Sequence, residues 1–313
     1  MRSPAKINKA IFFLALWMIA ANLVAGIIAE NFGLGAIVGT GIYQIVGLFV
    51  PFLFYLLVTK QNHRKVLAWK PLSLKNGLVV LALSVALLPM LQVVARIASF
   101  VFTPALMDIV EDVSITPIWL TFIIIAILPS FFEEFWFRGA MYTKYREGGV
   151  SIRKTAIITG IFFGLMHLNF HQAIYAAVMG FVYAYLLYYT RSIWAPIIGH
   201  IINNGIHALL LYSEPYMDWM ASFDDRAGMF LLIMGIASLV MLPVLILSIR
   251  HFKKYHAVTQ DQKPKEPVAE EEATAEESPQ SGIKAKVYTW GFWAAVTVFV
   301  LVAILMEFAL RIM

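Results

Sequence analysis

The stretch PIWLTFIIIAILPSFFEEFWFRG, residues 117–139, decides the fold class of this chain. The apolar part, 117–137, is long enough to cross the ~30 Å hydrocarbon core of a bilayer as a single helix. Only two charges interrupt it, the adjacent carboxylates of Glu133 and Glu134. Because a charge inside a spanning helix is costly, this stretch predicts a membrane helix that carries a functional site.

The rest of the chain repeats the apolar pattern. Of its 313 residues, 60% are hydrophobic and only 14% are charged, and the mean hydropathy is +0.76. This is more apolar surface than one soluble core can hide, so we expect a polytopic membrane protein. Counting apolar runs of roughly 17 to 25 residues, we predict spans at 10–29, 34–58, 77–100, 117–137, 173–189, 193–211, 229–249 and 288–310. A ninth, at 155–168, is shorter, and we include it because the charges between the spans sort to two sides only when it is kept.

We therefore predict an all-α, polytopic integral membrane protein with an eight-helix catalytic core and a ninth transmembrane helix at the C-terminus. The predicted parts are a membrane-embedded domain at 1–250 with its catalytic core at 117–211, an acidic linker at 251–287 and a final helix at 288–313. The linker is acidic and has almost nothing to bury, which is typical of a disordered tether. We expect the final helix to be an anchor appended to the core.

The charges between the spans sort to two sides. By the positive-inside rule, the side with more lysine and arginine faces the cytosol. Its basic residues are Lys60, Arg64, Lys65, Lys70, Lys75, Lys144, Arg146, Arg153, Lys154, Arg191, Arg250, Lys253 and Lys254. This predicts a multi-pass protein of the cell membrane with a cytosolic N-terminus and an external C-terminus. The first apolar run is long for a signal peptide, so we expect it to be retained.

The net charge of +5 and the absence of cysteine limit the partners and the chemistry. Because the basic residues lie between apolar runs, we expect them to contact membrane lipids and expect no nucleic acid partner. Without cysteine there are no disulfides, no thiolate metal sites and no cysteine nucleophile. Any hydrolytic chemistry must therefore use oxygen and nitrogen groups.

The acidic pair contains one carboxylate with a partner and one without. Glu134 and Arg138 are four residues apart and can pair on one face of a helix. Glu133 points about 100° away from Glu134, which leaves its carboxylate free for chemistry. The alternative is a helix end at which these charges simply meet lipid head groups.

Two histidines add to this site. His167 ends the span 155–168, and His200 lies in the span 193–211 with Asn204 on the same helix face. A lone histidine in an apolar helix is more often structural. Counted from the basic side at ~1.5 Å per residue, however, Glu133, His167 and His200 all lie roughly 14 to 20 Å deep. They can therefore meet at one level.

This set of residues can hydrolyse a peptide bond. Glu133 is the candidate general base, and His167 would hold the same water. His200 and Asn204 can donate hydrogen bonds to the developing oxyanion. Alternatively, Glu133, His167 and His200 are ligands of a divalent metal such as zinc, with an open position for water. The His-Glu-x-x-His metal motif is absent, and the metal alternative stays open.

Three motifs resemble, in order and approximate spacing, those of the CAAX protease and bacteriocin-processing family, which includes the type II CAAX prenyl endopeptidase. The resemblance covers roughly 117–211. It rests on Glu133-Glu134-x-x-x-Arg138, Phe163-x-x-x-His167 and His200-x-x-x-Asn204.

The resemblance implies an all-helical intramembrane endopeptidase with a cavity open to the cytosol. It implies that Glu133 and His167 activate water, that His200 and Asn204 hold the oxyanion, and that Glu134 and Arg138 support them. Members are often described as metalloproteases, although their need for a metal is disputed. All motif positions are filled in this chain.

We therefore predict an intramembrane endopeptidase whose substrates are membrane-anchored, lipid-modified or secreted-precursor peptides cut near the cytosolic face. Two other classes remain: a non-proteolytic scaffold or bacteriocin-immunity factor on the same fold, and a transporter. A final expectation concerns four tyrosines of the span 173–189, which we expect to form an interfacial belt. They are Tyr183, Tyr185, Tyr188 and Tyr189.

Overall fold

A computed structural model describes residues 4–104, 112–113, 116–223, 225–261 and 287–312 of the chain. Within these ranges every regular element is a helix, and seven helices are long and apolar enough to cross a membrane. The prediction of an all-α, polytopic membrane protein is confirmed.

The seven long helices are continuous, although two of them contain π-helical turns, three turns in all. Four of them are single elements: α1 (Pro4–Phe32), α5 (Leu74–Ser99), α11 (Phe170–Thr190) and α15 (Trp290–Ile312). The second helix, Gly35–Thr59, joins α2 (Gly35–Tyr43), η1 (Gln44–Phe49) and α3 (Val50–Thr59). The fourth, Ile118–Glu147, joins α7 (Ile118–Phe122), η2 (Ile123–Ile127), α8 (Leu128–Glu134), η3 (Phe135–Met141) and α9 (Tyr142–Glu147). The sixth spans Ala227–Val258 of α14 (Ala227–Asp261).

All nine predicted spans are helical, but two are shorter than a bilayer crossing requires. The span predicted at 155–168 is α10 (Ile152–Leu165), and the span predicted at 193–211 is α12 (Trp194–Leu210). The 14 residues of α10 rise only about 21 Å. Helix α12 carries His200 and Asn204, and His167 follows two residues after the end of α10.

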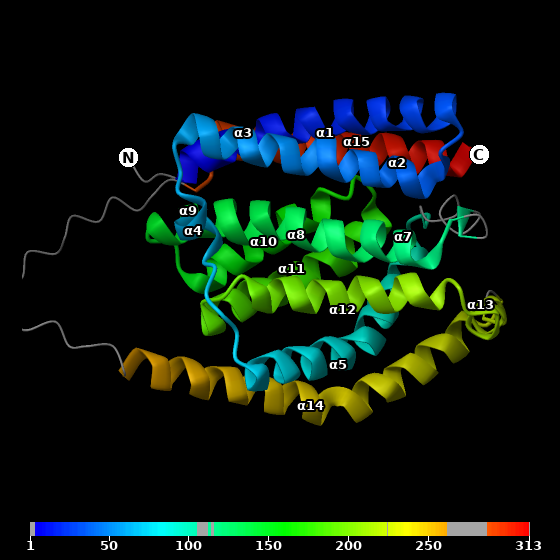
Figure 1. The fold of residues 1–313 in the computed structure, drawn as a ribbon. Coiled ribbons are helices and arrows are strands. Elements are labelled where there is room, and N and C mark those ends of the chain that lie inside the picture. The colour runs from blue at the N-terminus through cyan, green and yellow to red at the C-terminus, as the bar shows by residue number, and fades with distance from the viewer. Residues whose placement is uncertain (1–3, 105–111, 114–115, 224, 262–286, 313) are drawn as a thin grey trace, which may run out of the picture.

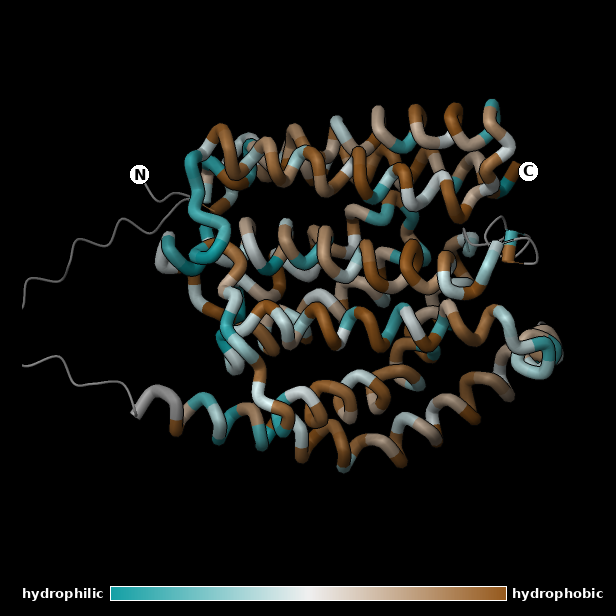
Figure 2. The backbone as a smooth tube through the Cα atoms, in the orientation of Figure 1, coloured by the Kyte–Doolittle hydropathy of each residue, from teal (hydrophilic) through white to brown (hydrophobic). Residues whose placement is uncertain are grey.

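The helices form three groups side by side (Figure 1). One group contains α1, the Gly35–Thr59 helix and α15; the group on the opposite side contains α5 and α14. Helices α8, α10, α11 and α12 lie between them. The N-terminus lies at the same end as the short α4 (His63–Leu67) and α9, whereas the C-terminus lies at the end with α13 (Glu214–Ala221). Hydrophilic residues gather at these two ends (Figure 2), as expected for a bundle that crosses a membrane.

Close contact between α10 and α11 depends on small residues. A Cβ atom on Gly160 would lie 2.9 Å from the carbonyl oxygen of Ala177, and one on Gly180 would lie 2.8 Å from the Cα of Gly160. Small residues four apart let the backbones of membrane helices approach closely. The two helices that flank His167 are therefore locked together without bulky side chains between them.

Replacing Gly164 by leucine is expected to destabilise the bundle. A Cβ atom there would overlap the carbonyl of Ala173 and lie 3.1 Å from the Cβ of Ala177, so α10 must move away from α11. Overpacking of this kind costs about 1–3 kcal/mol. The thermal unfolding temperature of Gly164→Leu in detergent should fall clearly below that of the matched control Gly235→Leu, since Gly235 has open space around it. Equal unfolding temperatures would contradict the close packing.

The C-terminal part differs from the prediction in one respect. Helix α14 continues to Asp261, so residues 251–261, predicted as the start of the linker, are helical. Side-chain contacts with α5 and α11 explain the extension. His251 Nε2 lies 2.8 Å from Asn76 Oδ1, Phe252 is buried in a cluster with Val80, and the His256 ring stacks on Tyr188. The remaining linker, 262–286, lies outside the described residues, and its disorder stays a prediction.

The last helix packs against α1 and also contacts the segment that follows α5. At one end, Asn8 Nδ2 donates to the carbonyl of Val287 (2.6 Å). At the other end, the carboxylate of Glu307 accepts hydrogen bonds from the backbone N–H and hydroxyl of Thr103 (3.1 Å each). Between them Phe299 is fully buried. Helix α15 is thus a packed member of the bundle, and its separation from the catalytic core stays a prediction about function.

Candidate active site

The acidic pair sits on the long Ile118–Glu147 helix, where α8 passes into η3. Arg138 contacts Glu134 through two nitrogens, Nε to Oε2 at 3.1 Å and Nη1 to Oε1 at 3.2 Å, and both side chains are fully buried. The guanidinium also donates to the carbonyl of Gly180 (2.9 Å) and lies 4.3 Å from the centroid of the Phe163 ring. The geometry matches the predicted pairing of Glu134 with Arg138, and the pair holds α8 against α10 and α11.

His200 bridges the two glutamates. Its Nδ1 lies 3.1 Å from Glu134 Oε1, and its Nε2 lies 4.0 Å from Glu133 Oε2. A carboxylate only accepts, so Nδ1 carries the hydrogen and donates it to Glu134. In the neutral imidazole, Nε2 is therefore the acceptor nitrogen, and it faces Glu133. The hydrogen bonds from Arg138 to Glu134 and from His200 to Glu134 thus fix both the orientation of the His200 ring and its tautomer.

Within the described residues, no arginine or lysine forms an ion pair with Glu133. Its side chain is 6% exposed, and its Oε2 accepts no hydrogen bond from the described part of the protein. A buried carboxylate oxygen without a hydrogen bond is costly unless the site uses it. The two glutamates thus differ in their surroundings: Glu134 pairs with Arg138, whereas Glu133 Oε2 has no hydrogen-bond partner among the described residues.

His167 lies outside α10, which corrects the prediction that it ends that helix. Helix α10 ends at Leu165, and Leu168 adopts a left-handed conformation (φ 59°) that turns the chain toward α11. The His167 Nδ1 lies 2.9 Å from the carbonyl of Phe163, one of the carbonyls that a helix end leaves unpaired. Because this Nδ1 must donate, the Nε2 of neutral His167 is an acceptor.

Aromatic rings connect the two histidines. The Phe163 ring packs edge-on against both His167 and His200, with centroids 5.5 and 5.6 Å apart. No hydrogen bond or ion pair within the described residues joins His167 directly to Glu133 or His200. His167 therefore lies beside the Glu133–His200 pair, and Phe163 is the spacer between the imidazoles.

Tyr183 is part of the site, which corrects its assignment to an interfacial belt. It is fully buried, its ring lies 5.6 Å from that of His200, and its hydroxyl accepts from Asn203 Nδ2 (2.7 Å). Tyr183 shares the buried face of α11 with Gly180. That helical periodicity was the signal that could have placed it inward, whereas Asn203 has no such signal beyond its position next to Asn204.

Asn204 donates a hydrogen bond to the carbonyl of Ile125, to which Pro129 cannot donate. In a regular helix the N–H of residue 129 would donate to the carbonyl of Ile125, but Pro129 has no N–H. Asn204 Nδ2 supplies the missing donor at 3.1 Å. His200 and Asn204 thus face the same long helix, as their spacing predicted, but one N–H of Asn204 is used for structure.

This contact predicts that the contribution of Asn204 to stability depends on the presence of Pro129. Asn204→Ala should lower the free energy of unfolding by about 1–3 kcal/mol, the cost of an unsatisfied buried carbonyl. In a Pro129→Ala background, the new N–H can reach Ile125, so the same substitution should cost clearly less. Thermal unfolding of the wild type, the two single variants and the double variant measures the difference. Equal costs in both backgrounds would show that the Ile125 contact does not matter.

The residues do not assemble into a metal site. Within the described ranges, no group of three or more histidine, aspartate or glutamate side chains is arranged to hold a metal ion. His200 directs Nδ1 to Glu134, and His167 lies to the side. The geometry of the described residues therefore does not support Glu133, His167 and His200 as a set of zinc ligands.

Comparison with known proteins points to one family. Residues 115–206 match the family described as "Type II CAAX prenyl endopeptidase Rce1-like". A relative, "Putative membrane peptidase YdiL" of Bacillus subtilis (strain 168), is 27% identical over 122 residues, which is 38% of this chain. The match spans 46% of that relative, about half its length. No solved structure matches the chain.

The matched segment contains every candidate residue. The buried ion pair, the two histidines and Asn204 all lie between 115 and 206, on α8, η3, the α10–α11 turn and α12. Several intramembrane helices and the family match agree on a multi-pass membrane protein. Residues 115–206 of this chain are therefore similar to the type II CAAX prenyl endopeptidase family.

Proposed function

We propose that this protein is an intramembrane endopeptidase of the cell membrane that cleaves membrane-anchored, lipid-modified or secreted-precursor peptides near the cytosolic face. One observation carries the proposal: two adjacent buried glutamates contact the two nitrogens of one histidine, and only one of these carboxylates is neutralised by an arginine. A purely structural cluster has no use for the second carboxylate, because a buried charge without a partner destabilises the fold.

In the proposed mechanism, Glu133 is the general base. The 4.0 Å between Glu133 Oε2 and His200 Nε2 exceeds a direct hydrogen bond but allows one water to contact both atoms. Glu133 takes a proton from this water as its oxygen attacks the scissile carbonyl carbon. The proton then passes to the leaving amine as the C–N bond breaks. The Nε2 of neutral His167 can accept a hydrogen bond from the same water.

The oxyanion is stabilised by donors on α12. In this mechanism His200 is an imidazolium from the start: its Nε2–H donates first to the water and then to the developing oxyanion, while its Nδ1–H remains hydrogen-bonded to Glu134. The negative charge of Glu134, itself held by Arg138, stabilises this imidazolium. Asn204 can add its second amide hydrogen, since the first is used on Ile125.

The test compares peptides in cells that express the wild type or Glu133→Gln. Mass spectrometry of membrane and secreted fractions should find uncut precursors that accumulate only with the variant, which also identifies the substrate. Glu30→Gln is the matched control, because Glu30 is an exposed glutamate at the end of α1. Identical peptide patterns at equal membrane levels would reject the protease. A cellular phenotype that survives Glu133→Gln would favour a scaffold or immunity factor.

A further inference from the structure

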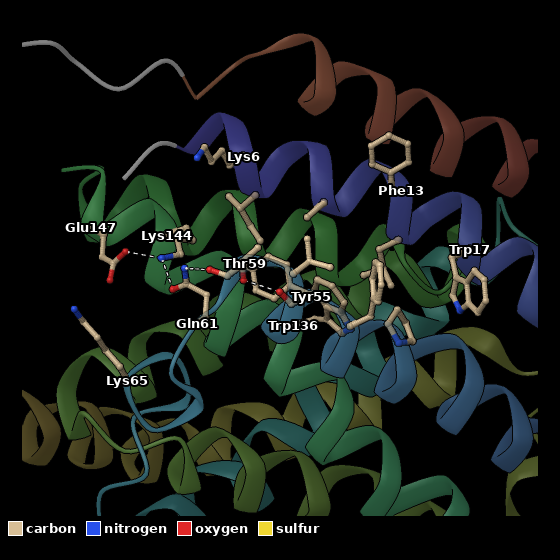
Figure 3. Close-up of a pocket in the computed structure, with 16 residues that line it drawn as sticks. Lys6, Phe13, Trp17, Tyr55, Thr59, Gln61, Lys65, Trp136, Lys144 and Glu147 are labelled. Atoms are coloured by element: carbon tan, nitrogen blue, oxygen red, sulfur yellow. Dashed lines mark hydrogen bonds and ion pairs between the residues drawn. The ribbon is translucent and has the colours of Figure 1, made fainter. Parts of the chain in front are cut away.

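A second site candidate lies apart from the catalytic residues, on the outer side of the bundle near α9. It is a groove of about 850 Å³ between α1, the Gly35–Thr59 helix and the segment η3–α9 (Figure 3). None of the six candidate catalytic and supporting residues lines it. The nearest link in sequence is Trp136, which forms part of its wall and is two residues from Glu134.

One end of the groove is positively charged. Lys6, Lys65 and Lys144 line it there together with Glu147 (Figure 3). Lys144 is neutralised, because its Nζ lies 2.8 Å from Glu147 Oε2 and 2.9 Å from Gln61 Oε1. Lys6 and Lys65 are exposed, and neither forms an ion pair with another residue in the described part of the chain. The groove end thus presents two uncompensated cations.

The other end of the groove is apolar and open to the surroundings. Phe13 is 61% exposed, Phe54 65% and Trp17 46%, and all three line the groove. Figure 3 shows Phe13 and Trp17 at the end away from the lysines. From Lys6 to Trp17, α1 rises about 16 Å, close to half of the ~30 Å hydrocarbon core. The apolar part therefore has the length of one leaflet.

We propose that this groove binds one anionic glycerophospholipid. Lys6 and Lys65 contact the phosphate and anionic head group at the membrane surface, and one acyl chain lies along Phe13 and Trp17. Charge complementarity favours an anionic lipid over a zwitterionic one, since each lysine near a membrane surface contributes about 1 kcal/mol, or about fivefold in affinity. This inference goes beyond peptide cleavage and does not depend on it.

Native mass spectrometry of the full-length protein in detergent tests the proposal. The probes are phosphatidylglycerol and phosphatidylcholine with the same acyl chains. We expect the wild type to retain one phosphatidylglycerol in preference to phosphatidylcholine. The double variant Lys6→Gln/Lys65→Gln should lower phosphatidylglycerol affinity at least tenfold and leave phosphatidylcholine binding unchanged. The matched control is Lys253→Gln/Lys254→Gln, which removes two exposed lysines from α14, on the opposite side of the bundle.

Three outcomes would overturn the proposal. One is equal retention of the two lipids by the wild type. Another is an equal loss of phosphatidylglycerol in the groove variant and the α14 control, which would indicate a non-specific charge effect. The third is displacement of the bound lipid by a lipid-modified peptide at equimolar concentration, which would assign the groove to the anchor of a substrate. Glu133→Gln should bind phosphatidylglycerol as the wild type does, so failure of the protease proposal would be recognised separately.

Discussion

Glu133→Gln is expected to lower the rate of peptide cleavage by about 10²–10⁴-fold, the usual contribution of a general base. Glutamine keeps the size of the side chain and its ability to contact water, but it cannot take a proton. Glu133 Oε2 has no hydrogen-bond partner among the described residues, so the substitution breaks no hydrogen bond of this oxygen within them. The measurement is the single-turnover rate on the identified substrate, together with the thermal unfolding temperature.

The combination of two readouts separates catalysis from structure. If Glu133 is the base, activity falls while the unfolding temperature stays the same or rises, because a buried carboxylate without a partner has been neutralised. Glu133→Asp should keep partial activity, since the carboxylate remains but lies one methylene farther from His200 Nε2. Loss of activity and of stability in parallel would instead make Glu133 a structural residue. Full activity of the glutamine variant would remove it from the mechanism.

The sequence predicted the long helices and the contact between Glu134 and Arg138, for physical reasons. Hydropathy reports directly which segments leave water, so the apolar runs became helices. Helical periodicity fixes neighbours on one helix, so the pairing of Glu134 with Arg138 and the separate direction of Glu133 follow from spacing alone. Because ionisable side chains in a membrane helix avoid lipid, they also indicated which helices face one another.

The parts that were missed depend on contacts between helices. Lipid and protein interior are equally apolar, so hydropathy cannot tell that Tyr183 faces His200 and not the membrane. The turn at Leu168, which places His167 beyond α10, is a backbone conformation without a composition signal. The Asn204 contact required knowing that Pro129 lies opposite α12. The groove at Lys6 is likewise lined by segments that are far apart in the sequence, so no single segment predicts it.

Arg138→Gln is expected to have the largest effect on stability. It leaves the fully buried Glu134 with only the His200 Nδ1–H, and it removes the donor to the Gly180 carbonyl. Breaking a buried ion pair by removing one partner costs about 3–5 kcal/mol, because the other charge remains without compensation. Thermal or denaturant unfolding of the purified protein in detergent measures this loss.

Two comparisons identify the cause of that loss. Adding Glu134→Gln to Arg138→Gln removes the orphaned charge while keeping an oxygen that can accept from His200, so the double variant should be more stable than the single one. Arg311→Gln is the matched control: Arg311 and Glu307 have the same four-residue spacing at 2.7 Å, but Arg311 is 59% exposed, so its loss should cost under about 1 kcal/mol. If the double variant is no more stable than Arg138→Gln, lost packing against Phe163 and Gly180 explains the effect, and Glu134 carries no buried charge for the arginine to neutralise.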